Sequence, residues 1–168
     1  MSETVEPVIN VADAQLIEHE KGRWGGAYKV LTPSMRPRGG KLGVNETRLR
    51  PGHVTVPFHA HQLEDEVFYV VSGRGVLRYG ETLRDIGPGD CISCPAGTGV
   101  AHQIANPFDE ELVYLAIGNY EPNEVCTYPD SGKVLVRSVG KIGWLEKVDY
   151  MEGEPEQPKV LDLIAARG

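Results

Sequence analysis

The chain has 168 residues, of which 24% are charged and 40% hydrophobic, a composition typical of a folded protein with one domain. A domain of this length buries enough surface to be stable without disulfide bonds. Its net charge of −7 argues against nucleic acid as a partner, because counterion release from phosphates requires a surplus of lysine and arginine.

The N-terminal segment 1–16 lacks the basic and apolar regions of a signal peptide. No apolar run reaches the ~20 residues of a membrane span, and no basic amphipathic helix suggests binding to a membrane surface. The three cysteines are an odd number, which fits a reducing compartment. We therefore expect a cytoplasmic protein with no membrane partner and no nucleic-acid partner.

Helical patterns are scarce and lie near the two ends of the chain. Residues 11–19 predict a short helix with Asn10 as its N-cap and Asp13 in its first turn. Near the other end, residues 149–159 are acidic and contain proline, which predicts an exposed linker. A second short helix is expected after it, at 161–167.

Between these ends, 20 glycines and 12 prolines punctuate the chain at short intervals. They separate short runs rich in valine, isoleucine, leucine and tyrosine, a pattern typical of antiparallel strands in a sandwich or barrel. The expected strands are 27–31, 42–49, 53–57, 66–72, 75–79, 91–94, 102–105, 112–117 and 133–139. Hairpin turns are expected at 71–76 and 79–81, and a tight turn at 87–90.

Cys91 and Cys94 form a CxxC sequence inside one of the expected strands. Residues three apart on a strand point to opposite faces, so one metal ion or one disulfide would not readily use both. We therefore interpret the pair as core cysteines, and Cys126 as a further small buried residue.

Three histidines and a glutamate are candidates for one metal site. His59 and His61 are two apart, so on a strand their imidazoles share a face. Glu66 begins the strand expected at 66–72, and His102 begins another. Each residue alone has an ordinary explanation, and the neighbouring carboxylates Glu64 and Asp65 compete with Glu66 for the role of ligand.

The spacing of these residues resembles the two motifs of the cupin superfamily. The first motif corresponds to Gly52, His59, His61, Glu66 and Gly73, with one extra residue before His59. The second corresponds to Gly89, Pro95, Gly97, His102 and Asn106, with two extra residues before His102. The resemblance implies one divalent transition metal per chain, bound by His59, His61, Glu66 and His102. We expect Asn106 to support the strand and turn near His102 rather than to touch a substrate.

The resemblance also implies a fold class and a domain organisation. The fold is all-β, a cupin double-stranded β-helix or jelly-roll barrel with short N- and C-terminal extensions. One domain spans 1–168, with a barrel core at about 41–120, an N-terminal arm at 1–40 and a C-terminal extension at 121–168. In that extension, residues 128–133 read Tyr-Pro-Asp-Ser-Gly-Lys, a good turn sequence. They also resemble a group of single-domain cupins that carries a sugar-phosphate isomerase-like label.

Three imidazoles and one carboxylate suit zinc, manganese, iron, nickel or cobalt, and leave coordination positions open for a small-molecule substrate. The first hypothesis is isomerase or epimerase chemistry on a sugar or sugar phosphate, with the metal polarising a carbonyl. Arg48, Phe68 and Lys133 are the candidate substrate-binding residues. Other candidate phosphate ligands are Lys41, Arg50 and Arg78, and candidate bases are Glu46, His53, Tyr69, Tyr128 and Lys133.

Two other hypotheses remain open. One is an iron-dependent dioxygenase or related oxidoreductase, for which Phe58, Phe68 and Val70 would supply a partly apolar pocket. The other is a barrel that binds a small ligand without turnover. Alternation along 66–72 places Tyr69 away from the face of Glu66, which argues against Tyr69 as a base.

We expect a twofold homodimer. The segments outside the barrel core carry apolar groups that must be buried against the barrel or against a partner: Trp24, Tyr28, Leu31, Trp144, Leu145 and Tyr150. Size-exclusion chromatography with light scattering measures the mass directly. A single species of 18.4 kDa, the mass of one chain, would contradict the expectation.

Overall fold

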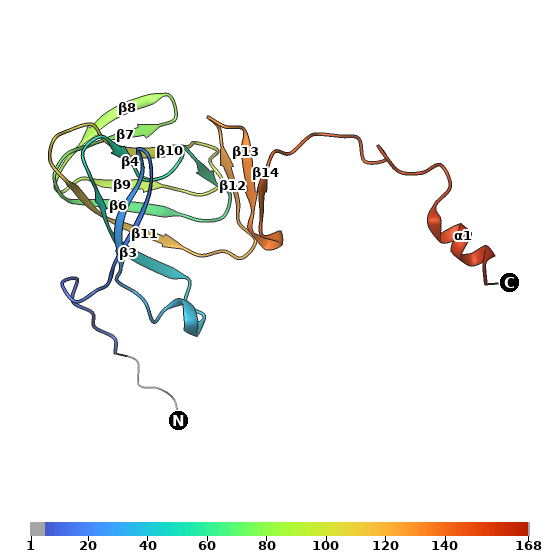
Figure 1. Cartoon of the computed structure of the whole chain (residues 1–168), viewed down its shortest axis with the longest axis horizontal. Coiled ribbons are helices and arrows are strands. Elements are labelled where there is room, and N and C mark those ends of the chain that lie inside the picture. Colours follow the sequence, from blue (N-terminus) through green and yellow to red (C-terminus); the bar gives the residue numbers. More distant parts are fainter. Residues whose placement is uncertain (1–5, 168) are drawn as a thin grey trace.

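A computed structural model describes residues 6–167, and nearly all of their regular structure is β-strand (Figure 1). The first five residues of the expected N-terminal arm, and Gly168, lie outside the described range. The strands are β1 (Leu16–Lys21), β2 (Trp24–Val30), β3 (Leu42–Leu49), β4 (His53–Val54), β5 (Ala60–His61), β6 (Glu66–Ser72), β7 (Gly75–Tyr79), β8 (Thr82–Ile86), β9 (Cys91–Cys94), β10 (His102–Asn106), β11 (Leu112–Asn119), β12 (Val125–Tyr128), β13 (Lys133–Val136) and β14 (Lys141–Gly143). The helices are η1 (Arg36–Arg38), η2 (Arg137–Val139) and α1 (Lys159–Ala165). The all-β expectation is confirmed.

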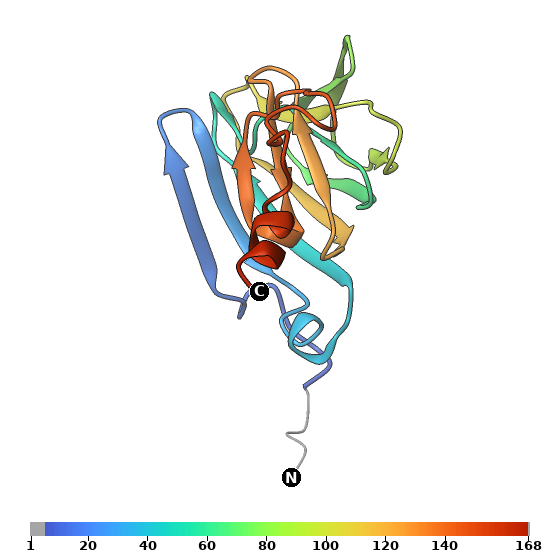
Figure 2. The ribbon, with the colours of Figure 1, turned by 90° about the vertical axis from the view of Figure 1, so that its right-hand side faces the viewer.

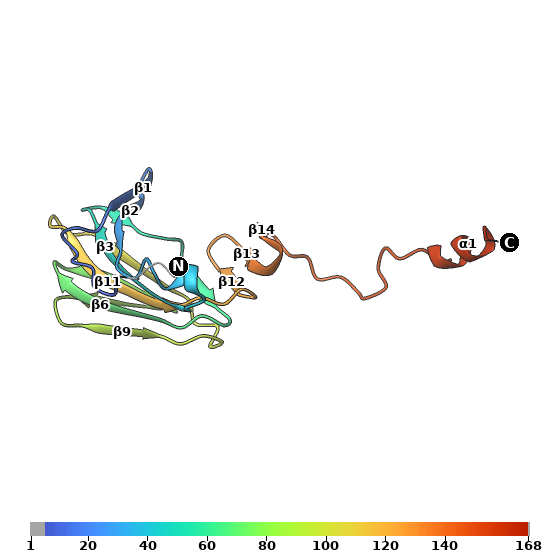
Figure 3. The ribbon, with the colours of Figure 1, turned by 90° about the horizontal axis from the view of Figure 1, so that it is seen from below.

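Ten of these strands form one large sheet that curls around the core. Its order is β8-β7-β10-β4-β2-β3-β11-β6-β9, and β1 pairs with β2 outside this path. Figure 3 shows β3, β11, β6 and β9 lying side by side as one wall. The main core cluster draws buried side chains from both ends of the order: Leu49, Phe68, Val70, Leu77, Ile86, Ile92, Cys94, Ile104, Leu112 and Tyr114. The two ends of the sheet therefore face one another across a shared core, as in a jelly roll.

The C-terminal extension adds a second, four-stranded sheet in the order β14-β13-β12-β5. Its innermost strand, β5, holds His61, which pairs with Cys126 of β12. β12 and β13 form a hairpin whose turn is the Tyr-Pro-Asp-Ser-Gly-Lys segment, so its interpretation as a turn is confirmed. The extension is thus joined to the barrel at the histidine motif.

The N-terminal helix prediction is wrong. The Asn10 side chain does cap a turn by accepting the Ala12 amide hydrogen, but no helix follows. Residues from Leu16 onward form β1, which pairs with β2 across a turn at Gly22 (φ 63°). Hairpin pairing with the sheet, through the turn at Gly22, outweighs the local helical pattern.

Two further expectations need correction. The segment 71–76 is not a hairpin, because β6 pairs with β9 and β11 whereas β7 pairs with β8 and β10. The chain crosses there from one wall of the barrel to the other. Cys94 and Cys126 are buried as expected, but Cys91 is exposed, because alternation along β9 turns it to the solvent. The turns at 79–81 and 87–90 are present.

The last part of the chain extends away from the barrel. After β14 it runs as an arm without strands and ends in the short helix α1 (Figure 1, Figure 2). Trp24, Trp144, Leu145 and Tyr150 are all exposed, so a single chain does not bury these apolar groups. Within residues 6–167, no helix is long and apolar enough to cross a membrane.

Gly73 and Gly52 offer a matched test of this fold, because both have φ of 74°. A Cβ at Gly73 would lie 2.1 Å from the Glu111 carbonyl oxygen, whereas one at Gly52 would meet nothing within 4 Å. We expect Gly52→Ala to lower the free energy of unfolding by about 1–2 kcal/mol through backbone strain. Gly73→Ala should lower it by about 3 kcal/mol or more, because the crossover must also move. Urea unfolding measures both, and equal losses would contradict the close packing at Gly73.

Candidate metal centre

Backbone pairing brings two of the proposed ligands side by side. The His59 amide donates to the His102 carbonyl at 3.2 Å, and the His102 amide donates to the His59 carbonyl at 2.8 Å. The two residues therefore form an antiparallel bridge, although 42 positions lie between them. Asn106, at the end of β10, donates through its side-chain amide to the Leu49 and Glu110 carbonyls, which is the supporting role expected of it.

The other two proposed ligands come from neighbouring strands. The Gly97 amide of the second motif donates to the His61 carbonyl at 2.9 Å, which ties the two motifs together. Gly97 has φ of 71°, so this turn favours glycine. Glu66 is the first residue of β6 and pairs with Gly118 and Cys94 on either side.

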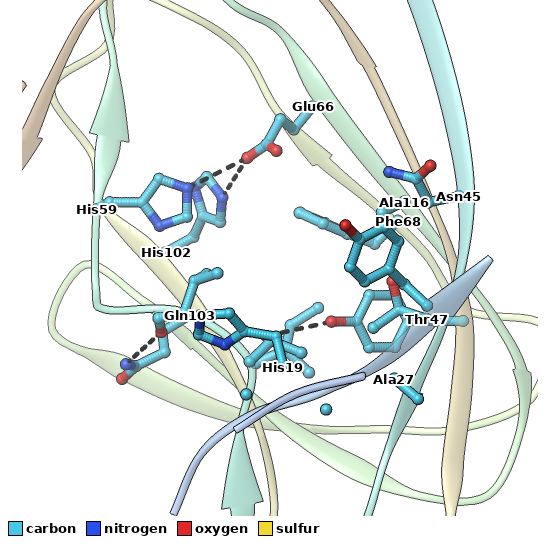
Figure 4. Close-up of a pocket in the computed structure, with 17 residues that line it drawn as sticks. His19, Ala27, Asn45, Thr47, His59, Glu66, Phe68, His102, Gln103 and Ala116 are labelled. Carbon is cyan, nitrogen blue, oxygen red and sulfur yellow. Dashed lines mark hydrogen bonds and ion pairs between the residues drawn. The ribbon is translucent and has the colours of Figure 1, made fainter. Parts of the chain in front are cut away.

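The four side chains converge on one carboxylate oxygen. Glu66 Oε2 lies 3.4 Å from His59 Nε2, 3.4 Å from His61 Nε2 and 2.8 Å from His102 Nε2. Ligand atoms of His59, His61 and Glu66 all lie within 4.8 Å of one another. Figure 4 shows His59 and His102 pointing toward Glu66 across the top of a cavity. The structure therefore brings together all four residues that the motifs predict as ligands.

The close approach of these groups shifts the pKa values of Glu66, His61 and His102. Burial alone would raise the pKa of Glu66, but the hydrogen bonds from His102, His59 and His61 lower it far below its usual range. Burial alone would lower the pKa of His61, but the hydrogen bond and charge of Glu66 outweigh burial and raise it. For His102 burial prevails and lowers the pKa. A negative carboxylate thus faces three imidazoles in the barrel.

The hydrogen bonds on the far side of two rings fix how those rings face Glu66. His59 Nδ1 lies 2.9 Å from the Pro57 carbonyl oxygen, which can only accept, so Nδ1 carries the hydrogen. His61 Nδ1 likewise faces a carboxylate oxygen of Glu124 at 3.3 Å. Each Nε2 can then meet Glu66 Oε2 in two ways: a second ring hydrogen donates to the carboxylate, or, without it, the Nε2 lone pair and the carboxylate can share a metal cation. The donor set fits a transition-metal ion.

Glu124 was not predicted, and it is the most buried charged residue near the site. Its side chain is fully buried and accepts the Gln62 amide at 2.8 Å and the Leu63 amide at 2.9 Å. It lies just before β12, in the C-terminal extension. No sequence spacing links it to His61, because only the pairing of β5 with β12 brings the two together.

Glu64, which the sequence offered as an alternative ligand to Glu66, lies on the same side of His61 as Glu124. Its carboxylate lies 3.6 Å from His61 Nδ1 but forms a two-point ion pair with Arg137. Arg137 also donates to the Glu121 carbonyl at 2.9 Å. Asp65, the other rival, accepts the Ala96 amide at 2.8 Å. Both rivals to Glu66 are therefore engaged elsewhere.

A cavity of about 290 Å³ opens beside the cluster and is lined by His59, Glu66 and His102. Of the three predicted substrate-binding residues, Phe68 lines this cavity. Arg48 lies on the opposite face of β3, paired with Glu46 and Glu111. Lys133 lies over the Tyr128 ring, 5.7 Å from its centroid, and is not among the lining residues.

None of the predicted bases lines the cavity either. Glu46 pairs with Arg48, Tyr69 is exposed as alternation along β6 predicts, and His53 Nδ1 contacts the Pro51 carbonyl. Tyr128 is nearer, because its ring stacks on that of His59 with centroids 6.3 Å apart. Burial raises the pKa of Tyr128 well above its usual value.

The turn after Tyr128 is tied to the barrel by charge. Asp130 accepts two hydrogen bonds from Arg78 of β7, at 2.7 and 3.0 Å. The Arg78 guanidinium in turn covers the buried Phe58 ring, 3.6 Å from its centroid. The segment 128–133 is therefore held against β7 next to the buried Phe58.

The cavity also contains residues that the sequence did not point to. They are His19, Tyr28, Asn45, Thr47, Thr55, Gln103 and Tyr114. Alternation along β3 would have grouped Asn45 with Thr47, since both point inward, but nothing in the sequence marked that face as a binding wall. His19 was missed because its segment was assigned to a helix.

Solved structures with a similar fold include two that cover most of this chain. A candidate sugar phosphate isomerase from Acidithiobacillus ferrooxidans is 25% identical, with a TM-score of 0.70 over 83% of this chain and 92% of its own. A sugar phosphate isomerase of the cupin superfamily from Silicibacter pomeroyi is 26% identical, with a TM-score of 0.69 over 91% of this chain and 98% of its own. A predicted oxalate decarboxylase from Thermotoga maritima, 24% identical over 68% of this chain and 99% of its own, shares the fold with a TM-score of 0.59.

No curated protein matches the chain in sequence. Residues 45–118 match the family model of the Cupin domain. This segment runs from within β3 to within β11, and it contains the four converging side chains and both glycine-rich motifs. With the curled all-β sheet and the similar solved structures, the match shows that residues 45–118 carry the cupin fold.

Proposed function

We propose that the protein is a metal-dependent isomerase or epimerase that acts on a small hydroxy-carbonyl compound of the sugar or sugar-phosphate class. The observation that supports it is the meeting of three imidazoles and one carboxylate at the wall of a cavity. The similar structures from Acidithiobacillus ferrooxidans and Silicibacter pomeroyi, which bear the sugar phosphate isomerase name, favour this reaction class over the alternatives.

The proposed roles follow from position. His59, His61, Glu66 and His102 would hold one divalent ion, and Pro57 and Glu124 would orient two of the rings. A bound metal supplies Lewis acidity to a carbonyl or hydroxyl oxygen of the substrate. Phe68 would bound the substrate on its apolar side, and Tyr128 would exclude water from behind His59.

Metal content tests the proposal first. We expect about one zinc, manganese or nickel ion per chain in protein purified without a histidine tag, and none in the His59→Ala/His61→Ala double variant. The double variant should remain folded, because the main core cluster is apolar and contains neither residue. Elemental analysis and circular dichroism measure the two properties.

Each outcome separates the hypotheses. Full metal retention in the folded double variant would refute the ligand set. One iron per chain with substrate-dependent oxygen uptake would favour the dioxygenase. A bound metal without turnover of sugars or aromatic substrates would favour a ligand-binding barrel.

Glu124→Gln tests the support of His61. The amide that replaces one carboxylate oxygen would face backbone N–H donors, and the hydrogen bond that orients His61 would weaken. We expect metal affinity to fall about 10–100-fold, as for other carboxylates that orient a metal-bound histidine. The control is Glu121→Gln. Glu121 lies in the same loop as Glu124, but its side chain pairs with Lys41, so this change should leave metal affinity unchanged. Competition with a chromogenic chelator measures affinity, and equal values for the two variants would exclude an orienting role for Glu124.

A further inference from the structure

We infer that the cavity takes an unphosphorylated polyhydroxy-carbonyl ligand, a free sugar rather than a sugar phosphate, and that His19 contacts it. This inference rests on the proposed function and narrows its substrate class. It departs from the sugar phosphate named for the similar structures, and four observations support it.

First, no lysine or arginine is among the residues that line the cavity. A phosphate ester is normally held by such cations or by the N-terminus of a helix. Among the described residues, 6–167, those that line the cavity include no such cation and no helix N-terminus. Every lining residue lies in a strand or in a segment between strands. The glycines Gly25 and Gly26 in the lining pair with Glu20 and His19 of β1, so their backbone belongs to a hairpin ladder.

Second, the cations that the sequence offered for phosphate have other partners. Arg48 follows the inward-facing Thr47 on β3, and alternation turns it to the outer face beside Glu46 and Glu111. The remaining four are paired as follows: Arg50 with Glu20, Arg78 with Asp130, Lys41 with Glu121, and Lys133 with the ring of Tyr128. Bringing one of them to the cavity would break an ion pair or a ring contact.

Third, the wall away from the metal centre mixes apolar and polar groups, and apart from His19 and two tyrosines none of its side chains is ionisable. It presents amide and hydroxyl groups from Asn45, Thr47, Thr55 and Gln103 beside the aromatic face of Phe68. Tyr114 adds a phenol that donates to Thr55 Oγ1 at 3.2 Å, and burial raises the pKa of this phenol to about 12, so it stays neutral. Neutral donors and acceptors match sugar hydroxyls, whereas a dianionic phosphate would meet no lysine or arginine there.

Fourth, His19 lies at the cavity opposite the metal centre. Figure 4 shows His19 between Gln103 on one side and Thr47 on the other, below His59 and His102. The hairpin can lie this close to the barrel because residue 26 is glycine and has no Cβ. A Cβ there would be only 2.7 Å from the Arg48 carbonyl oxygen. Within residues 6–167 the His19 side chain has no hydrogen-bond partner of its own. Apart from His59 and His102, which are proposed ligands, His19 is the one imidazole that lines this cavity. It is therefore available to a ligand hydroxyl.

The test uses the full chain loaded with zinc and matched pairs of ligands: ribose and ribose 5-phosphate, glucose and glucose 6-phosphate, and fructose and fructose 6-phosphate. Saturation-transfer NMR measures binding, and proton NMR measures isomerisation. We expect at least one free sugar to bind and convert, with its phosphate ester converting at least ten-fold more slowly. Equal or faster conversion of the ester would overturn the inference and leave the proposed function standing. No binding and no conversion in any pair would overturn both.

Two neighbouring variants test the contact from His19. His19→Ala removes the imidazole from the cavity, whereas Glu18→Ala changes the next residue of β1, which lines a different depression beside Arg48. We expect His19→Ala to weaken binding of the free sugar about ten-fold with unchanged zinc content, and Glu18→Ala to bind as the unaltered protein does. Equal binding by both variants would exclude the contact. Loss of zinc in His19→Ala would also overturn it, since the effect would then arise at the metal centre.

Discussion

A half-buried negative charge organises one end of this barrel. Glu66 places a carboxylate oxygen against three imidazole nitrogens, and such a charge is tolerated in a protein interior only when it is compensated. Three backbone features hold the imidazoles beside this carboxylate. They are the bridge between His59 and His102, the turn at Gly97 and the pairing of β5 with β12. If the carboxylate were removed, the three rings would lose the group on which they converge.

A second carboxylate, that of Glu124, lies on the side of the His61 ring that faces away from Glu66. Glu124 is fully buried, yet it accepts two backbone amides and faces His61, so its charge is also compensated. Arg137 balances the neighbouring Glu64. Negative and positive groups thus alternate outward from the metal centre, while the cavity wall on the opposite side carries no lysine, arginine or carboxylate. A support of paired charges on one side and a wall without lysine or arginine on the other distinguish the two sides of the site.

Much of this arrangement could be predicted from the sequence, for identifiable reasons. Strands β3, β6, β7 and β9 have the expected bounds, because apolar alternation between glycine and proline turns is a local signal. The four proposed ligands also follow from motif spacing. Glu124 could not be found in this way, since it reaches His61 only through pairing between strands far apart in the chain. His19 was hidden by a local helical pattern that hairpin pairing overrides, and the crossover at Gly73 was mistaken for a hairpin because glycine marks both.

The placement of Glu124 outside the segment that matches the family model has an evolutionary consequence. Residues 45–118 contain every proposed ligand but neither Glu124 nor β12, the strand that pairs with His61. Mutations in the C-terminal extension can therefore change how firmly His61 is held while both sequence motifs stay intact. Two chains with identical motifs could drift apart in metal preference by this route, and comparing the motifs alone would not reveal the divergence.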